Sequence, residues 1–189
     1  MLDRGIVAWA IDAMWIVWGV VWLAKAFGNK RNAFSQSWLS RFGYLLASIG
    51  LGLALAYGSR WRTRLFPETM ATQIAGMVLC AAGIGVAIWS RFILGSNWSG
   101  IITLKENHEL IRRGPYKYVR HPIYSGMILG ILGTFVAVFP RVNGLLIVIS
   151  VAIMLKIKSL QEEKILIASF PNDYRRYRKE VKSLIPLVM

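Results

Sequence analysis

The stretch that organises this chain reads Arg112-Arg113-Gly114-Pro115-Tyr116-Lys117-Tyr118-Val119-Arg120-His121-Pro122-Ile123-Tyr124-Ser125-Gly126. Four Lys or Arg side chains, one histidine, three tyrosines and two prolines lie here, at the entrance of an apolar segment. Polar groups this dense at the mouth of a membrane helix are costly to desolvate, so they favour a site for a charged ligand over a purely structural role. We therefore predict a cofactor site in this stretch.

The composition is that of a membrane protein. The 189 residues are 56% hydrophobic, their mean hydropathy is +0.48, and runs of about 20 residues are almost free of charge. The first run has no short apolar region ending at small residues, so we expect no removable signal peptide. The one cysteine, Cys80, lies in an apolar segment, and the sequence therefore predicts neither a disulfide framework nor a four-thiolate metal site.

The apolar runs predict an all-α, polytopic membrane protein with about five transmembrane helices followed by cytoplasmic C-terminal helices. The predicted spans are Gly5–Ala24, Phe42–Gly58, Met70–Ser90, Ile123–Phe139 and Gly144–Leu155. The fifth is short for a crossing, and we expect it to continue as a helix beyond the bilayer. Pro140 to Gly144 predicts a tight turn that makes spans four and five an antiparallel hairpin. We divide the chain into N-terminal transmembrane helices (1–95) and a catalytic region (96–189).

Small residues four apart favour close helix packing in two of these spans. They are Gly76 and Cys80, or Ala81 and Gly85, in the third span, and Gly126, Gly130 and Thr134 in the fourth. Asp12 is the only charge in the first span, and it is either a functional acid or a residue near the lipid head groups.

Charge predicts the orientation of the chain. The linker after span one, the third loop and the tail hold 18 Lys and Arg residues, against 5 on the other side. The positive-inside rule then places the organising stretch and the C-terminus in the cytoplasm and the N-terminus outside.

The tail predicts two helices, Leu160–Ser169 and Tyr174–Leu184, separated by a break at which Asn172 or Asp173 caps the second. Tyr174, Tyr177, Val181 and Leu184 share one face of the second helix. Its basic residues indicate an interfacial helix attracted to anionic lipid. Earlier in the tail, Lys158 and Glu162 are one turn apart with Glu163 beside them, and a solvated ion pair is the ordinary interpretation.

The two regions together resemble the isoprenylcysteine carboxyl methyltransferase family and the related phospholipid N-methyltransferases. The resemblance spans roughly Asn97 to Pro186. It depends on Gly114-Pro115-Tyr116, on Arg120-His121-Pro122-Ile123-Tyr124-Ser125-Gly126, on Glu162-Glu163, and on Phe170, Tyr174, Tyr177 and Ile185-Pro186.

The resemblance implies that S-adenosylmethionine binds at the cytoplasmic ends of the last two spans. The implied cofactor contacts are His108, Glu109, Leu110, Ile111, Tyr116, His121, Pro122, Ile123, Tyr124 and Glu162. It also implies that Lys158 faces the substrate, at a position where the eukaryotic carboxyl methyltransferases have arginine. Lysine keeps the charge but lacks the bidentate fork, which leaves the acceptor open.

The chemistry of the residues fits this cofactor. Glu162 suits its ammonium group, His121 and backbone N–H groups at a helix start suit its carboxylate, and Tyr116 or Tyr124 suits its adenine. The sequence has no glycine-rich dinucleotide motif and no histidine spacing typical of a metal site.

Methyl transfer is an in-line displacement that requires alignment and desolvation. A carboxylate acceptor needs only a cation such as Lys158 or Arg120 to place it, whereas an amine needs a base, with Glu163 or a tyrosine as candidates. Asn97 and Trp98 are candidate walls of the acceptor pocket, although Trp98 suits an interfacial anchor equally well.

Other classes of protein remain open from the sequence. A membrane sterol or steroid reductase would use NADPH, but the full sterol enzymes have about twice as many spans. A non-catalytic protein that binds anionic lipid would explain the net charge of +14, and a small transporter subunit would require more polar groups at mid-bilayer.

Overall fold

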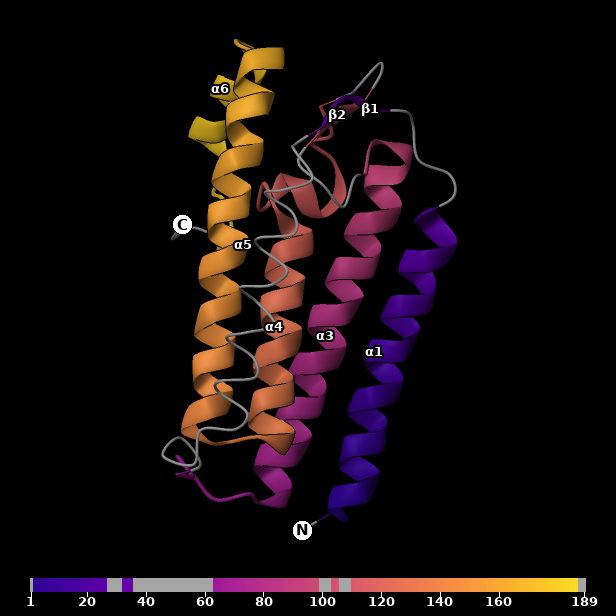
Figure 1. Cartoon of the computed structure of the whole chain (residues 1–189), viewed down its shortest axis with the longest axis vertical. Helices are drawn as coiled ribbons and strands as arrows, with labels where there is room; N and C mark the ends of the chain where they lie inside the picture. Colours follow the sequence, from indigo (N-terminus) through magenta and orange to yellow (C-terminus); the bar gives the residue numbers. More distant parts are fainter. Residues whose placement is uncertain (1, 27–31, 36–62, 99–102, 106–109, 187–189) are drawn as a thin grey trace.

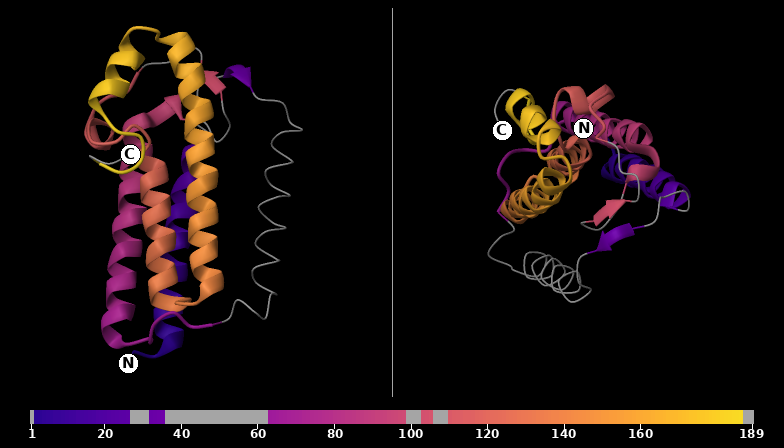
Figure 2. Two further views of the ribbon diagram at one scale, coloured as in Figure 1. Left: turned by 90° about the vertical axis from the view of Figure 1, so that its left-hand side faces the viewer. Right: turned by 90° about the horizontal axis from the view of Figure 1, so that it is seen from above.

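The computed structural model describes residues 2–26, 32–35, 63–98, 103–105 and 110–186. Within these residues, four long helices run side by side (Figure 1). They are α1 (Arg4–Ala26), α3 (Met70–Leu94), α4 (Pro122–Val138) and α5 (Val142–Ser169). Helices α1, α3 and α5 run in one direction and α4 in the other (Figures 1 and 2). The end at which α4 begins also carries the shorter elements: η2 (Gly95–Asn97), η3 (Gly114–Lys117), α6 (Asp173–Glu180) and the strands β1 (Asn32–Ser35) and β2 (Thr103–Lys105).

Three of the described helices, α1, α3 and α5, are long and apolar enough to cross a membrane, and α4 is a shorter apolar helix. They correspond to the first, third, fifth and fourth predicted spans. The second predicted span, Phe42–Gly58, lies outside the described residues. The prediction of an all-α fold is confirmed for the described residues, which add only a short antiparallel pair of strands, β1 and β2, within the predicted linkers.

Helices α3 and α4 pack closely because glycines line their contact. A Cβ atom at Gly83 would lie 2.3 Å from the backbone nitrogen of Gly130, and one at Gly133 would lie 2.3 Å from that of Cys80. The predicted face with Gly76 and Cys80 is thus confirmed. The alternative face is wrong, since a Cβ at Gly85 would meet nothing within 4 Å. On the predicted face of α4, the hydroxyl oxygen of Thr134 accepts a 3.0 Å hydrogen bond from Nε1 of Trp15 in α1.

The hairpin of α4 and α5 is confirmed, but its turn is shorter than predicted. Helix α5 begins at Val142, so the Asn143-Gly144 pair lies in its first turn and does not break it. Position 144 has to be glycine for this arrangement, because a Cβ atom there would lie 2.3 Å from the carbonyl oxygen of Phe139. Glycine lets α5 start directly against the end of α4.

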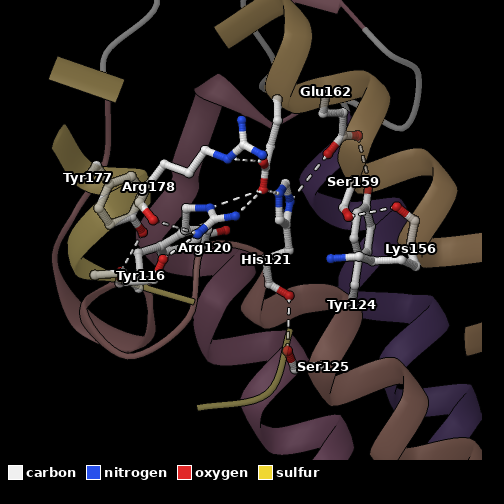
Figure 3. A network of polar contacts seen from close by, with 12 residues as sticks. Tyr116, Arg120, His121, Tyr124, Ser125, Lys156, Ser159, Glu162, Tyr177 and Arg178 are labelled. Carbon is white, nitrogen blue, oxygen red and sulfur yellow. Dashed lines mark hydrogen bonds and ion pairs between the residues drawn. The ribbon is translucent and has the colours of Figure 1, made fainter. Parts of the chain in front are cut away.

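Helix α5 is continuous through the predicted fifth span and the first predicted tail helix, as expected for a helix that continues beyond the bilayer. Its 28 residues give a length of about 42 Å, which exceeds the roughly 30 Å of a hydrocarbon core. The last turns of α5 therefore lie beside the start of α4, where Glu162 contacts Tyr124 and His121 (Figure 3).

The second tail helix is shorter than predicted. Helix α6 ends at Glu180, and Val181 is extended, because the next residues pair with the organising stretch. Backbone nitrogens of Arg120 and His121 donate to the carbonyl oxygens of Lys182 (2.8 Å) and Ser183 (3.0 Å). Asn172 is the N-cap residue, without a side-chain hydrogen bond to the helix. The predicted apolar face is otherwise confirmed, since Tyr174, Tyr177 and Leu184 are buried.

Candidate active site

The organising stretch is held against the bundle at both ends. At its start, Gly114 has φ +60°, a conformation that favours glycine, and a Cβ atom there would lie 3.1 Å from the side chain of Ile93 in α3. At its end, Pro122 occupies the first position of α4, where a backbone N–H would have no hydrogen-bond partner within the helix. His121 is the N-cap residue. The helix start thus aims His121 and Tyr124 at α5.

Glu163 is the centre of a buried ionic cluster. Its Oε1 accepts hydrogen bonds from Nε (3.0 Å) and Nη2 (2.7 Å) of Arg120, and Nε2 of His121 lies 3.2 Å away. Nε of Arg178 lies 3.5 Å from Oε2. The side chain of Glu163 is only 3% exposed. Its charge is therefore matched by cations within the protein.

Glu162 has a different environment one residue earlier. Its Oε1 accepts a 2.6 Å hydrogen bond from the hydroxyl of Tyr124, and its Oε2 lies 3.6 Å from Nδ1 of His121 (Figure 3). The His121 and Tyr124 rings are parallel, with centroids 5.6 Å apart. The Glu162 side chain is 21% exposed. Glu162 is therefore oriented by Tyr124 and His121 and remains accessible to a cationic group.

Lys158 adds a cation to the same face. It lies one turn before Glu162 on α5, and its Nζ is 5.5 Å from the centroid of the Tyr124 ring. The structure thus brings together Lys158, Tyr124 and Glu162 on one side of His121, and Arg120 and Glu163 on the other.

Most of the other predicted site residues lie at the start of α4, before η3 or just after α3, and two are residues that the structure does not describe. Pro122 and Ile123 are buried in the first turn of α4, and Leu110 and Ile111 precede η3. Asn97 is buried in η2, and Trp98 packs edge-on against Trp22 of α1, with ring centroids 5.8 Å apart. His108 and Glu109 lie outside the described residues.

Tyr116 lies in η3 with its side chain buried. Its carbonyl oxygen accepts a hydrogen bond from the hydroxyl of Tyr177 in α6. Burial raises the pKa of the Tyr116 and Tyr177 phenols well above the ordinary value. Both therefore stay protonated at neutral pH, which argues against either acting as a phenolate base.

Sequence reasoning missed the role of residues 181–184, which form a C-terminal strap across the organising stretch. Arg120 Nη1 donates to the carbonyl oxygens of Val181 and Arg178, and the hydroxyl of Ser125 donates to that of Leu184. These contacts involve backbone carbonyls, which have no signature in a sequence. The position of Arg178 on a basic helix predicted contact with anionic lipid, whereas the structure places its guanidinium near Glu163.

Arg91 is a second missed residue. It lies near the end of α3, is 1% exposed, and donates 2.6 Å hydrogen bonds to the carbonyl oxygens of Gly95 and of Lys25 in α1. Its guanidinium also lies 4.4 Å from the Trp98 ring centroid. Arg91 therefore fixes the end of α1, η2 and Trp98 to one another.

Comparison with known proteins gives the family. The isoprenylcysteine carboxyl methyltransferase (ICMT) family matches residues 74–168, half of the chain, and the match includes α4, most of α5 and the Glu162-Glu163 pair. The chain belongs to the ICMT family. The match includes both the pair of Arg120 with Glu163 and the pair of Tyr124 with Glu162.

Individual relatives agree with this family assignment. A protein-S-isoprenylcysteine O-methyltransferase of Schizosaccharomyces pombe is 36% identical over 96 residues, which are 50% of this chain and 41% of that protein. The uncharacterized protein YpbQ of Bacillus subtilis is 33% identical over 162 residues, 84% of this chain and 95% of that protein. The chain thus spans less than half of the yeast relative but nearly all of the bacterial one.

A solved structure shows the same fold. It is the eukaryotic intramembrane Ras methyltransferase ICMT, which matches with a TM-score of 0.61 and 20% identity over 77% of this chain and 53% of that one. Together with the apolar helices, this similarity makes the chain an integral membrane protein.

Proposed function

We propose that this protein is an S-adenosylmethionine-dependent methyltransferase of the membrane, and that it methylates the carboxylate of a lipidic acid such as an isoprenylcysteine. The observation that carries the proposal is Glu162, an accessible acid held by Tyr124 and His121 at the start of α4. Family membership supports the same reaction. It favours methyl transfer over the reduction that a sterol-type enzyme would catalyse.

The residues present fit the cofactor. Its ammonium group needs an accessible carboxylate, and Glu162, whose side chain is 21% exposed against 3% for Glu163, meets this requirement better. The N-terminal end of α4 supplies backbone N–H groups for its carboxylate. Bound S-adenosylmethionine would supply an electrophilic methyl group on a sulfonium centre. The protein then has to orient the acceptor and exclude water.

The distribution of bases favours a carboxylate acceptor. An amine must lose a proton before it attacks, but the Tyr116 phenol is held neutral by its raised pKa, and Glu163 is occupied by Arg120, Arg178 and His121. An ionised carboxylate needs no base. Lys158 is suited to place it, since its ammonium lies 5.5 Å from the centroid of the Tyr124 ring, whose hydroxyl donates to Glu162. Arg120 is committed to Glu163 and to the strap, and we assign it a positioning role.

We further propose that this site faces the cytoplasm, with the N-terminus outside, as the excess of Lys and Arg predicts. A lipidic acceptor would then enter from the bilayer, while the water-soluble cofactor enters from the cytoplasm.

Calorimetry on the detergent-purified chain tests the choice of cofactor. We expect S-adenosylhomocysteine to bind and NADPH not to bind. A panel of prenylcysteine acids and lipid amines, incubated with labelled S-adenosylmethionine, then tests the acceptor. Binding of NADPH alone would contradict the proposal, and methylation confined to amines would contradict the assignment of a carboxylate.

A further inference from the structure

A small cavity with polar and apolar walls lies at the opposite end of the bundle from the candidate active site. Its volume is about 100 Å³, and its polar lining consists of Arg4 of α1, Glu68, Gln73 of α3 and Arg141, which precedes α5. Val7, Ala137 and Val138 form an apolar wall. This end of the bundle is where α1, α3 and α5 begin and α4 ends (Figure 1).

Two hydrogen-bond donors that line this cavity have no partner within the described part of the chain. Gln73 is 1% exposed, and its carbonyl oxygen accepts a 3.0 Å hydrogen bond from the backbone N–H of Leu2. Its amide nitrogen has no partner there, and neither has the guanidinium of Arg141. An amide nitrogen without a protein partner at a cavity wall can donate to a ligand that accepts hydrogen bonds.

The charge around the cavity favours an anion. Glu68, with a side chain 5% exposed, is already matched by Arg4 at 2.7 Å and by Arg64 at 3.0 Å. Asp3, the other acid at this end, accepts from the first backbone N–H groups of α1. Among the described residues at this end, Arg141 is therefore a cation without an acidic partner. The N-terminal ends of three helices add to the positive potential.

We propose that this cavity binds the phosphodiester group of an anionic phospholipid, with Arg141 and Gln73 as the donors. A cavity of this size admits a phosphate group but not a whole lipid. The adjoining apolar residues, at the end of membrane-length helices, suit the glycerol and the first acyl carbons. The site is separate from the methyl-transfer site, so it holds or fails independently of the proposed reaction.

The experiment uses the full chain, purified and delipidated in dodecyl maltoside. Native mass spectrometry counts bound lipid during titration with dioctanoyl phosphatidylglycerol, dioctanoyl phosphatidylcholine or inorganic phosphate. We expect one saturable phosphatidylglycerol site, which Arg141→Gln weakens about tenfold or more, because a charge-assisted hydrogen bond is lost. Gln73→Leu should weaken the same site.

The matched control is Arg175→Gln, which removes the same charge from the exposed side of α6 at the other end of the protein. It should leave the saturable site unchanged. Equal weakening by Arg141→Gln and Arg175→Gln would overturn the proposal, as would equal affinity for phosphatidylcholine. Saturation by inorganic phosphate as tightly as by phosphatidylglycerol would overturn the assignment to a lipid.

Discussion

Arg120, which precedes α4, and Glu163 of α5 form a buried ion pair, with Nε and Nη2 of the arginine 3.0 and 2.7 Å from one carboxylate oxygen. Their side chains are 7% and 3% exposed. The same guanidinium donates to the carbonyl oxygen of Val181. One side chain thus joins the organising stretch, the end of α5 and the C-terminal strap.

Removal of one member of this pair should destabilise the protein strongly. Arg120→Met leaves the Glu163 charge buried with fewer partners, and we expect the free energy of unfolding to fall by about 3 to 5 kcal/mol. Chemical unfolding in dodecyl maltoside measures the change. Arg178→Met is the control, because that side chain is 53% exposed and lies 3.5 Å from Glu163. A loss below about 1 kcal/mol for Arg120→Met would show that the pair does not hold the strap.

Glu162→Gln should weaken S-adenosylhomocysteine binding by about tenfold or more, because the cofactor ammonium loses its carboxylate. Tyr124→Phe should have a smaller effect, since it removes the 2.6 Å hydrogen bond that orients Glu162 but keeps the charge. Calorimetry gives both affinities, and retention of the helical circular dichroism spectrum checks the fold. Unchanged affinity in Glu162→Gln would refute its assigned role.

Lys158 should affect the acceptor and not the cofactor. We expect Lys158→Ala to raise the KM for a prenylcysteine acid about tenfold while the affinity for S-adenosylhomocysteine stays within twofold. Lys158→Arg keeps the charge and should restore most of the loss. If Lys158→Ala instead lowered cofactor affinity with KM unchanged, the lysine would belong to the cofactor site.

The contact of α3 and α4 should be intolerant of added volume. A Cβ at Gly83 would lie 2.3 Å from the backbone of α4, so Gly83→Ala should destabilise the protein by about 1 to 3 kcal/mol. Gly85→Ala adds the same methyl group two residues along, where nothing lies within 4 Å, and should change stability by less than about 0.5 kcal/mol. Similar losses in both variants would contradict this packing.

Two buried tyrosines predict a loss of stability in alkali. Burial raises the pKa of Tyr116 and Tyr177, so above the ordinary tyrosine pKa of about 10 the unfolded chain loses protons that the folded chain keeps. Stability should therefore fall as pH rises above about 10, by up to about 1.4 kcal/mol per pH unit for each tyrosine. Tyr116→Phe should flatten this dependence between pH 10 and 11. A slope equal to that of the wild type would refute the prediction.

Much of the fold was predictable because long apolar runs and small residues are local signals. The helices over predicted spans one, three, four and five, their hairpin, and the buried face of Tyr174 and Tyr177 all follow from residue type and spacing. The meeting of Tyr124 with Glu162 also followed, but only because the resemblance to a family joined two segments 38 residues apart.

The sequence could not predict the end of α6, the start of α5 or the partner of Arg120, because these depend on backbone hydrogen bonds and contacts between distant segments. Val181 and Leu184 continue the periodicity of α6, yet the helix ends at Glu180 because Arg120 and His121 donate hydrogen bonds to the backbone carbonyls of residues 181–183. Asn143 and Gly144 favour a turn, but close contact with Phe139 places them in α5. Glu163 is buried and paired whereas Glu162 is accessible, because Arg120 binds Glu163 and not Glu162.

The central claim is that Glu162 holds the cofactor for methylation of a carboxylate. The most direct measurement incubates purified protein with methyl-labelled S-adenosylmethionine and N-acetyl-S-farnesylcysteine, and then treats the product with alkali. We predict label that alkali releases as volatile methanol, as a methyl ester requires, and at least a tenfold lower rate for Glu162→Gln. Label that resists alkali, or equal rates for Glu162→Gln and the wild type, would contradict the claim.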